Sequence, residues 1–295
     1  MIAGARLQVQ MLLSRSRPVL AVISLIALVG LYWAQISDIM RMAVTGTDRG
    51  YVLIVPAVAI YLMVIRRSRL KRGRNEGQGA FIGVLLVVAS FWMSWFGHDR
   101  DLLAVWQMAP VIALIGLCMT VMGLPRVWAL SPGFFILLAF VPIPGGILQK
   151  LGQPLQAIAT SVTAWLLNLL GVDAVRMGNL IEINGVQVAV GEACNGMRLI
   201  LPLAVVMYAF VFSLPLRAPT RITLLILCLP VTLFCNVIRL VPTALSYGYL
   251  PDQATVVHEI GGWVMIPLAI LMLVGLLRLM AWADLSVSRF RLVTA

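Results

Sequence analysis

The sequence predicts an all-α polytopic membrane protein with about eight transmembrane helices. Hydrophobic residues make up 61% of the 295 positions, and charged residues only 11%. A soluble domain carries roughly a quarter charged residues, so this chain lacks the polar surface that would cover it in water. The apolar residues also collect into runs close to the roughly 20 residues that cross a hydrocarbon core about 30 Å thick.

Eight apolar stretches qualify as spans: 18–36, 50–65, 79–97, 102–124, 128–147, 197–216, 222–247 and 257–278. Arg15 and Arg17 precede the first stretch, which is long enough to span and has no convincing small-residue cleavage site after it, so we expect a helix rather than an ordinary signal peptide. No repeat, linker or low-complexity segment divides the chain. We therefore expect one integral membrane domain over 1–295.

The basic residues predict the orientation of the chain. With both termini in the cytoplasm, the inner segments hold 15 of the 22 Lys and Arg residues but only two of the 11 acidic ones. This is the positive-inside bias of membrane proteins. It explains the net charge of +11 without a nucleic-acid partner. We predict a multi-pass protein of the plasma (inner) membrane, with the long segment 148–196 on the outer, periplasmic side.

This outer segment predicts two elements before the sixth span. LGQPLQAIATSVTAWLLNLLG, from Leu151, reads as a helix too polar to be an easy span, so we expect it at the interface or packed on the bundle. In VRMGNLIEINGVQVAV, from Val175, Asn184-Gly185 is a strong signal for a two-residue hairpin. The alternating valines that follow are typical of one strand face. We predict a small outer β-meander that leads directly to Cys194.

Cys194 is the candidate nucleophile. A membrane cysteine is usually a small buried hydrophobe, but Cys194 is expected at the outer boundary and at a helix N-terminus, where the macrodipole favours a thiolate. Arg198, at i+4, adds positive charge on the same face. Gly196 leaves room for a substrate backbone, and free N–H groups there could bind an oxyanion. The other cysteines fall inside predicted spans, at Cys118, Cys228 and Cys235.

Two further spans contribute polar side chains at the outer boundary. Arg239 lies about 25 Å along the seventh span, just below the outer surface, and Asn236 shares its face. Arg239 has two interpretations: an arginine that snorkels to the headgroups, or a functional ionisable residue inside a span. His258 begins the eighth span, where a lone histidine is either an interfacial residue or an acid/base.

Together these positions bring a thiol, a guanidinium and an imidazole to one depth. That is the composition of a cysteine acyl-transfer site, with Cys194 as nucleophile, Arg239 as oxyanion stabiliser and His258 as general acid/base. An alternative division has His258 positioning the substrate while Arg239 interacts with the thiolate. We expect no metal, because arginine is not a metal ligand and no second Cys or His is spaced to help. No motif indicates a cofactor.

These stretches resemble the exosortase/archaeosortase family. Glu192-Ala-Cys-Asn-Gly-Met-Arg198 matches its E-A-C-S-G-x-R pattern, Asn236-Val-Ile-Arg239 matches N-x-x-R, and His258 precedes Gly261 and Gly262 as the family's histidine precedes a glycine. Asn195 stands where serine is more usual, so an amide must replace any role of that hydroxyl. Pro142-Ile-Pro144 and Gly50-Tyr51 also look like the family. The resemblance covers about 45–280 and implies that this stretch is the core of the domain.

The resemblance implies a membrane cysteine protease and transpeptidase. Its substrates would be secreted proteins with a C-terminal sorting signal of the PEP-CTERM kind: a short motif such as Pro-Glu-Pro, a transmembrane helix and a basic tail. The enzyme would cleave near the motif through an acyl-thioester and pass the protein to a surface acceptor at the membrane lipid boundary. The supporting residues would be Glu192, Asn195, Gly196, Arg198 and Asn236.

Two alternatives remain open at this point. A non-catalytic transporter of lipid or polymer could line its path with these polar residues, and it would tolerate Cys194→Ser. A purely hydrolytic membrane protease would cleave without transfer, and the mass of its product would distinguish it.

Overall fold

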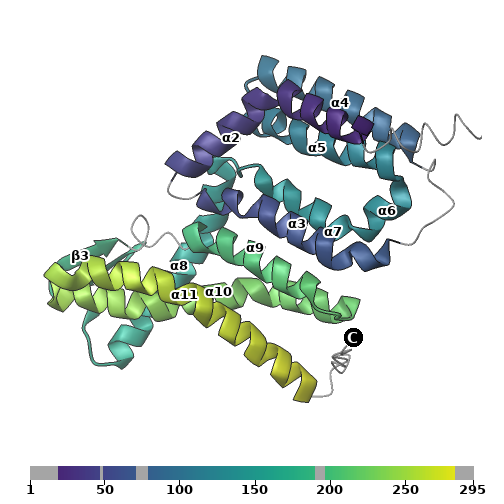
Figure 1. Ribbon diagram of the computed structural model, residues 1–295. Coiled ribbons are helices and arrows are strands. Elements are labelled where there is room, and N and C mark those ends of the chain that lie inside the picture. Colours follow the sequence, from purple (N-terminus) through teal and green to yellow (C-terminus); the bar gives the residue numbers. More distant parts are fainter. Residues whose placement is uncertain (1–18, 47–48, 71–78, 190–196, 283–295) are drawn as a thin grey trace, which may run out of the picture. The chain divides into compact units, whose positions relative to one another are not determined.

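The computed structural model describes residues 19–46, 49–70, 79–189 and 197–282 (Figure 1). These residues are mostly helical, with one three-stranded sheet. Two compact units divide the chain, Met1–Ile143 and Pro144–Ala295. The expectation of one integral domain over 1–295 stays a prediction.

The described residues of unit 1 form helices and no strands. The helices are Val19–Leu31, α2 (Trp33–Thr45), α3 (Val55–Ile65), α4 (Ala80–Asp99), α5 (Leu103–Met122), α6 (Leu124–Ala129) and α7 (Ser131–Ile136), with 3₁₀ turns η1 (Gly50–Leu53), η2 (Arg66–Arg69) and η3 (Leu137–Phe140). α4 and α5 pack closely, since a Cβ at Gly116 would lie 2.7 Å from the Gly83 carbonyl oxygen. Small residues permit such close approach between helices in membranes.

The first expected span is broken at Tyr32. The helices before and after it meet at 67°. Tyr32 at the break, and Gln35 and Asp38 of α2, recur every three residues. They share hydrogen bonds of 2.8, 2.7 and 2.8 Å with Ser90, Ser94 and Gln107. The partners of these polar side chains lie on α4 and α5. The need to satisfy these hydrogen bonds is a physical reason for the bend, which the length of the apolar stretch alone does not predict.

Unit 2 contains α8 (Gly145–Leu169), β1 (Ala174–Met177), β2 (Leu180–Ile183), β3 (Val186–Ala189), α9 (Met197–Ser213), α10 (Ala218–Tyr249) and α11 (Pro251–Trp282). The strands form an antiparallel sheet in the order β1-β2-β3, so the predicted meander is confirmed. Asn184 and Gly185 link β2 to β3 with φ of +52° and +76°. Positive φ at both positions is the signature of a type I′ turn, which Asn-Gly favours.

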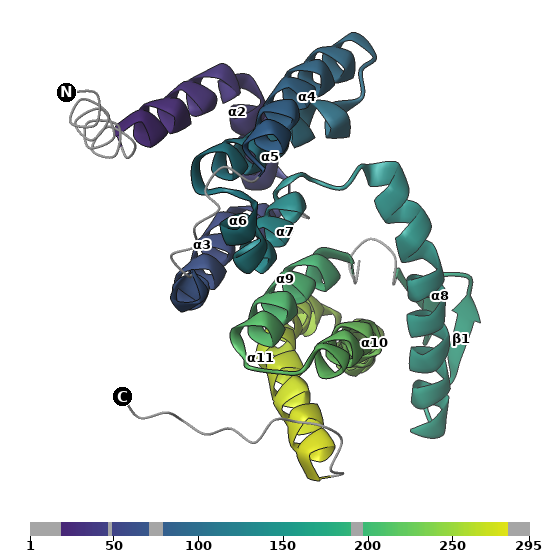
Figure 2. The same ribbon diagram turned by 90° about the vertical axis from the view of Figure 1, so that its right-hand side faces the viewer.

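α10 is the central helix of unit 2. Val237, Leu240 and Ala244 form one core with α8 and the sheet, so the polar helix expected from Leu151 packs on the bundle. Figure 2 shows α8 upright beside β1. A second core joins α10 to α9 and α11 and contains Met207, Val211, Leu224, Cys228, Val231, Cys235, Met265, Ala269 and Leu273.

The helices support a multi-pass membrane protein. Within the described ranges, five helices are long and apolar enough to cross a membrane, and two broken pairs qualify when each is counted as one span. Each of the eight expected stretches corresponds to a helix or a pair, but three do not qualify singly. The first is broken at Tyr32, the fifth is interrupted at Pro142 and Pro144, and α9 ends at Ser213, before Pro215.

Candidate active site

α10 and α11 form an antiparallel helical hairpin that positions Arg239 opposite Gly261. Arg239 lies ten residues before Tyr249, the end of α10, and Gly261 lies ten residues after Pro251, the start of α11. At 1.5 Å per residue both positions are about 15 Å from the turn. The short connection at Leu250 therefore sets the register between the two helices.

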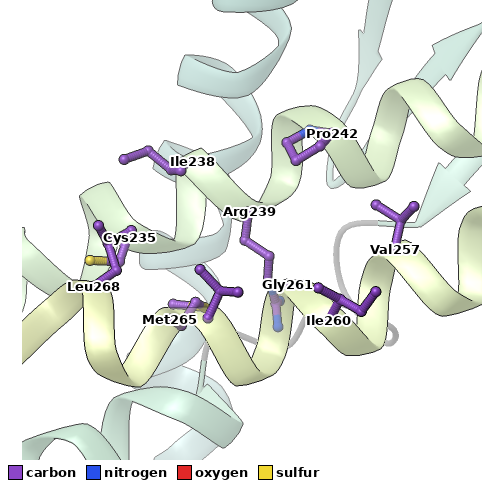
Figure 3. Close-up of a pocket in the computed structure, with 10 residues that line it drawn as sticks. Cys235, Ile238, Arg239, Pro242, Val257, Ile260, Gly261, Met265 and Leu268 are labelled. Carbon is purple, nitrogen blue, oxygen red and sulfur yellow. The ribbon is translucent and has the colours of Figure 1, made fainter.

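The Arg239 side chain crosses the backbone of α11 at Gly261 (Figure 3). A Cβ at position 261 would lie 2.7 Å from Arg239 Cγ and 3.3 Å from Cδ, so a larger residue would displace the arginine. Arg239 is only 6% exposed. Such burial favours a role inside unit 2 over snorkelling to headgroups.

A pocket of about 290 Å³ opens between α10 and α11 beside this crossing (Figure 3). Arg239 is the one charged residue among the described residues that line it. The other lining residues are Cys235, Ile238 and Pro242 of α10, and Val257, Ile260, Gly261, Val264, Met265 and Leu268 of α11. This arrangement places hydrogen-bond donors in a largely apolar wall, where each one interacts more strongly with a ligand than it would in solution.

Asn236 and Thr243 flank Arg239 on α10. Asn236 is 6% exposed, and its amide Oδ1 is buried with no hydrogen-bond partner within the part of the chain that the structure describes. A buried acceptor of this kind is costly unless a ligand or another group satisfies it. The Thr243 hydroxyl donates to the Arg239 carbonyl at 2.8 Å and stabilises this turn of the helix.

His258 lies one helical turn before Gly261 on α11 and is half-buried. The structure thus brings two of the candidate residues, Arg239 and His258, onto neighbouring helices, with Asn236 one turn from Arg239. Glu192, Cys194, Asn195 and Gly196 lie outside the described residues. Arg198 belongs to the first turn of α9.

Sequence reasoning did not identify three features of this region. Gly261 faces Arg239, Cys235 lines the same pocket with its sulfur 3.6 Å from Met272 Sδ, and Pro242 forms part of the wall. The spacing of Cys235, Arg239 and Pro242 (i, i+4, i+7) on one helical face was the available signal. Which residues of α11 face these three side chains depends on the register between α10 and α11, which only the structure shows.

The described residues form no cluster of metal ligands at this site. Across the ranges that the structure describes, no group of three or more His, Cys, Asp or Glu side chains could hold a metal ion.

Comparison with known families identifies the chain. The family model described as transmembrane exosortase matches residues 43–275, which includes α10, most of α11 and most of both units. No curated protein and no solved structure matches the chain. Because the family match covers well over half of the sequence, the chain belongs to the transmembrane exosortases, a family of membrane transpeptidases.

Proposed function

We propose that this protein is a cysteine transpeptidase that removes C-terminal sorting signals from secreted proteins and transfers them to a surface acceptor. The observation that carries the proposal is the burial of Arg239 between α10 and α11, in the wall of an apolar pocket. A charged side chain inside a membrane-spanning segment is costly, and such residues mark functional sites. Membership of the exosortase family supports the same reaction class.

The proposed reaction begins at Cys194. Its thiolate attacks the carbonyl carbon of the scissile peptide bond, and the carbonyl oxygen becomes an oxyanion that Arg239 stabilises with guanidinium N–H groups. The C–N bond then breaks, and protonated His258 gives its proton to the leaving amine. A thioester remains on Cys194. An acceptor amine or hydroxyl next loses its proton to His258 and attacks the thioester, and the thiolate leaves.

The geometry of α9 supports a meeting of Cys194 and Arg239. α9 and α10 are joined by only four residues and pack together, so they run antiparallel. Met197 is about 24 Å from the inner end of α9, and Asn236 is about 27 Å from the start of α10. Cys194 precedes Met197 by three residues. Glu192, Asn195, Gly196 and Arg198 are its nearest candidates for supporting roles.

Substitution of each cysteine tests the assignment. The substrate is a secreted reporter that ends in a short motif, an apolar helix and a basic tail, taken from a protein of the same organism. Cys194→Ala should abolish processing, followed as a gel shift. The matched controls Cys118→Ala and Cys228→Ala, which do not line the pocket, should process the reporter at rates close to that of the unchanged protein.

Product mass distinguishes the two possible outcomes of thioester breakdown. A reporter fragment with the mass of the free carboxylic acid indicates hydrolysis and would reduce the activity to that of a protease. A fragment heavier than that acid, by the mass of the acceptor less one water, indicates transfer. Robust processing by Cys194→Ala would refute the proposed covalent mechanism.

A further inference from the structure

We propose that the pocket between α10 and α11 binds a main-chain amide in an apolar stretch of the substrate polypeptide. This inference rests on the proposed function, because it assigns a peptide-binding role to the wall in which Arg239 lies. It adds binding groups, the carbonyl of Ile238 and the apolar rim, that are independent of the nucleophile.

The outer rim of the pocket is exposed at the surface of the helix pair. Ile238, Ile260 and Val264 all line the pocket, yet they are 42%, 57% and 52% exposed. All three belong to helices that are apolar enough to cross a membrane. An occupant can therefore enter laterally from the hydrocarbon, and it must be largely apolar to do so.

Two consecutive residues of the lining, Ile238 and Arg239, carry polar groups. Pro242 has no N–H, so the Ile238 carbonyl lacks its usual α-helical partner four residues later. The Thr243 hydroxyl donates to the Arg239 carbonyl instead of to that of Ile238. The guanidinium of the next residue, Arg239, carries N–H donors into the same wall. One backbone acceptor and one side-chain donor thus stand at consecutive positions.

This pair of groups matches an amide better than it matches a lipid. A peptide unit has one N–H to donate to Ile238 and one carbonyl to accept from Arg239. An acyl chain has no hydrogen-bonding group, and a phosphodiester accepts hydrogen bonds but donates none. The volume of about 290 Å³ lies at the lower end of the range for whole ligands, so the pocket suits a short piece of a longer chain.

Photocrosslinking identifies the occupant without turnover. A benzophenone amino acid replaces Val264 in the full-length Cys194→Ala chain, which is co-expressed with the sorting reporter and irradiated in membranes. We expect an adduct with the reporter polypeptide. The control position, Leu271 on the same helix, is 68% exposed and does not line the pocket, so it should give no such adduct. An adduct of Val264 with phospholipid alone would overturn the proposal.

A pair of proline substitutions tests the acceptor. Pro242→Ala restores an N–H that can occupy the Ile238 carbonyl, and we expect the apparent KM for the reporter to rise about 3- to 10-fold while kcat changes little. Pro230→Ala makes the same change elsewhere in α10, away from the pocket, and should leave KM unchanged. Equal KM values in both variants, with normal accumulation in the membrane, would refute the role of the Ile238 carbonyl.

The two experiments separate this inference from the reaction itself. If the crosslink forms but Cys194 proves dispensable for processing, the proposed binding site stands and only the assignment of Cys194 as nucleophile is refuted. If Cys194→Ala loses processing but no polypeptide crosslinks at Val264, the proposed reaction stands and the proposed binding site is refuted.

Discussion

Arg239 passes so close to Gly261 that a single added carbon would meet its side chain, since a Cβ at position 261 would lie 2.7 Å from Arg239 Cγ. The two residues come from different helices, α10 and α11, and their separation depends on the register of the hairpin. Gly261 therefore acts as a positioning residue for the guanidinium. A methyl group there must move either the arginine or the helix.

Gly261→Ala should slow processing about 100-fold, because a displacement of about 1 Å at a reacting group can cost that much. Gly262→Ala is the matched control: apart from the glycine, its chain neighbours and the adjacent backbone of the same helix, no atom lies within 4 Å of a Cβ at that position. Its activity should therefore stay near that of the unchanged protein. Reporter processing and the amount of protein in the membrane measure both variants. Similar activities in the two would show that Arg239 tolerates displacement.

Arg239→Lys should process the reporter about 10²–10³-fold more slowly, the cost of losing one oxyanion donor. Lysine keeps the charge but loses the planar arrangement of N–H groups. Initial rates of the reporter shift check this, with Arg278→Lys near the end of α11 as a control. If Arg239 only interacts with headgroups, lysine serves equally well, and an unchanged rate would leave Arg239 a structural residue.

Much of the architecture was predictable because it depends on local patterns. The apolar runs predicted the membrane helices, and Asn184-Gly185 predicted the turn between β2 and β3, since this pair readily adopts two positive φ values. The shared face of Asn236 and Arg239 follows from helical spacing alone. Exosortase family membership was likewise recognisable from short motifs.

The remaining features depend on partners far away in the sequence. The bend at Tyr32 follows from hydrogen bonds to Ser90, Ser94 and Gln107, which only the packed structure reveals. The pocket follows from the register of α10 against α11. Cys194 lies outside the described residues, so its place beside Arg239 stays a prediction.

Cysteines introduced at two described positions test the orientation. In intact cells of a variant without native cysteines, a membrane-impermeant thiol reagent should label Gln187→Cys on β3 but not Ser68→Cys after α3. The division of basic residues predicts that Gln187 lies outside and Ser68 inside, and both side chains are exposed. Lysed cells provide the control, because both cysteines should then react. The reverse pattern in intact cells would invert the topology and the proposed side of the active site.

Gln107→Leu should destabilise unit 1. Gln107 Nε2 donates to Asp38 Oδ2 at 2.8 Å, and Gln107 is 1% exposed. Loss of this donor to a carboxylate should lower the free energy of unfolding by about 1–3 kcal/mol. Thermal unfolding in detergent measures the change. Ser37→Ala is the control, because that hydroxyl is exposed and donates only to the nearby Ala34 carbonyl. Equal midpoints for the two variants would show that the Gln107–Asp38 bond contributes nothing to stability.

His258→Ala should separate the two halves of the proposed reaction. The imidazole is needed to protonate the leaving amine and again to deprotonate the acceptor. If breakdown of the thioester is the slower half, the variant should accumulate a covalent adduct on Cys194. Intact-protein mass spectrometry would detect it as an added mass that disappears with hydroxylamine. If cleavage is the slower half, no adduct forms and the uncleaved reporter accumulates instead. Wild-type rates without an adduct would contradict both versions and leave His258 a half-buried side chain of α11 with no part in proton transfer.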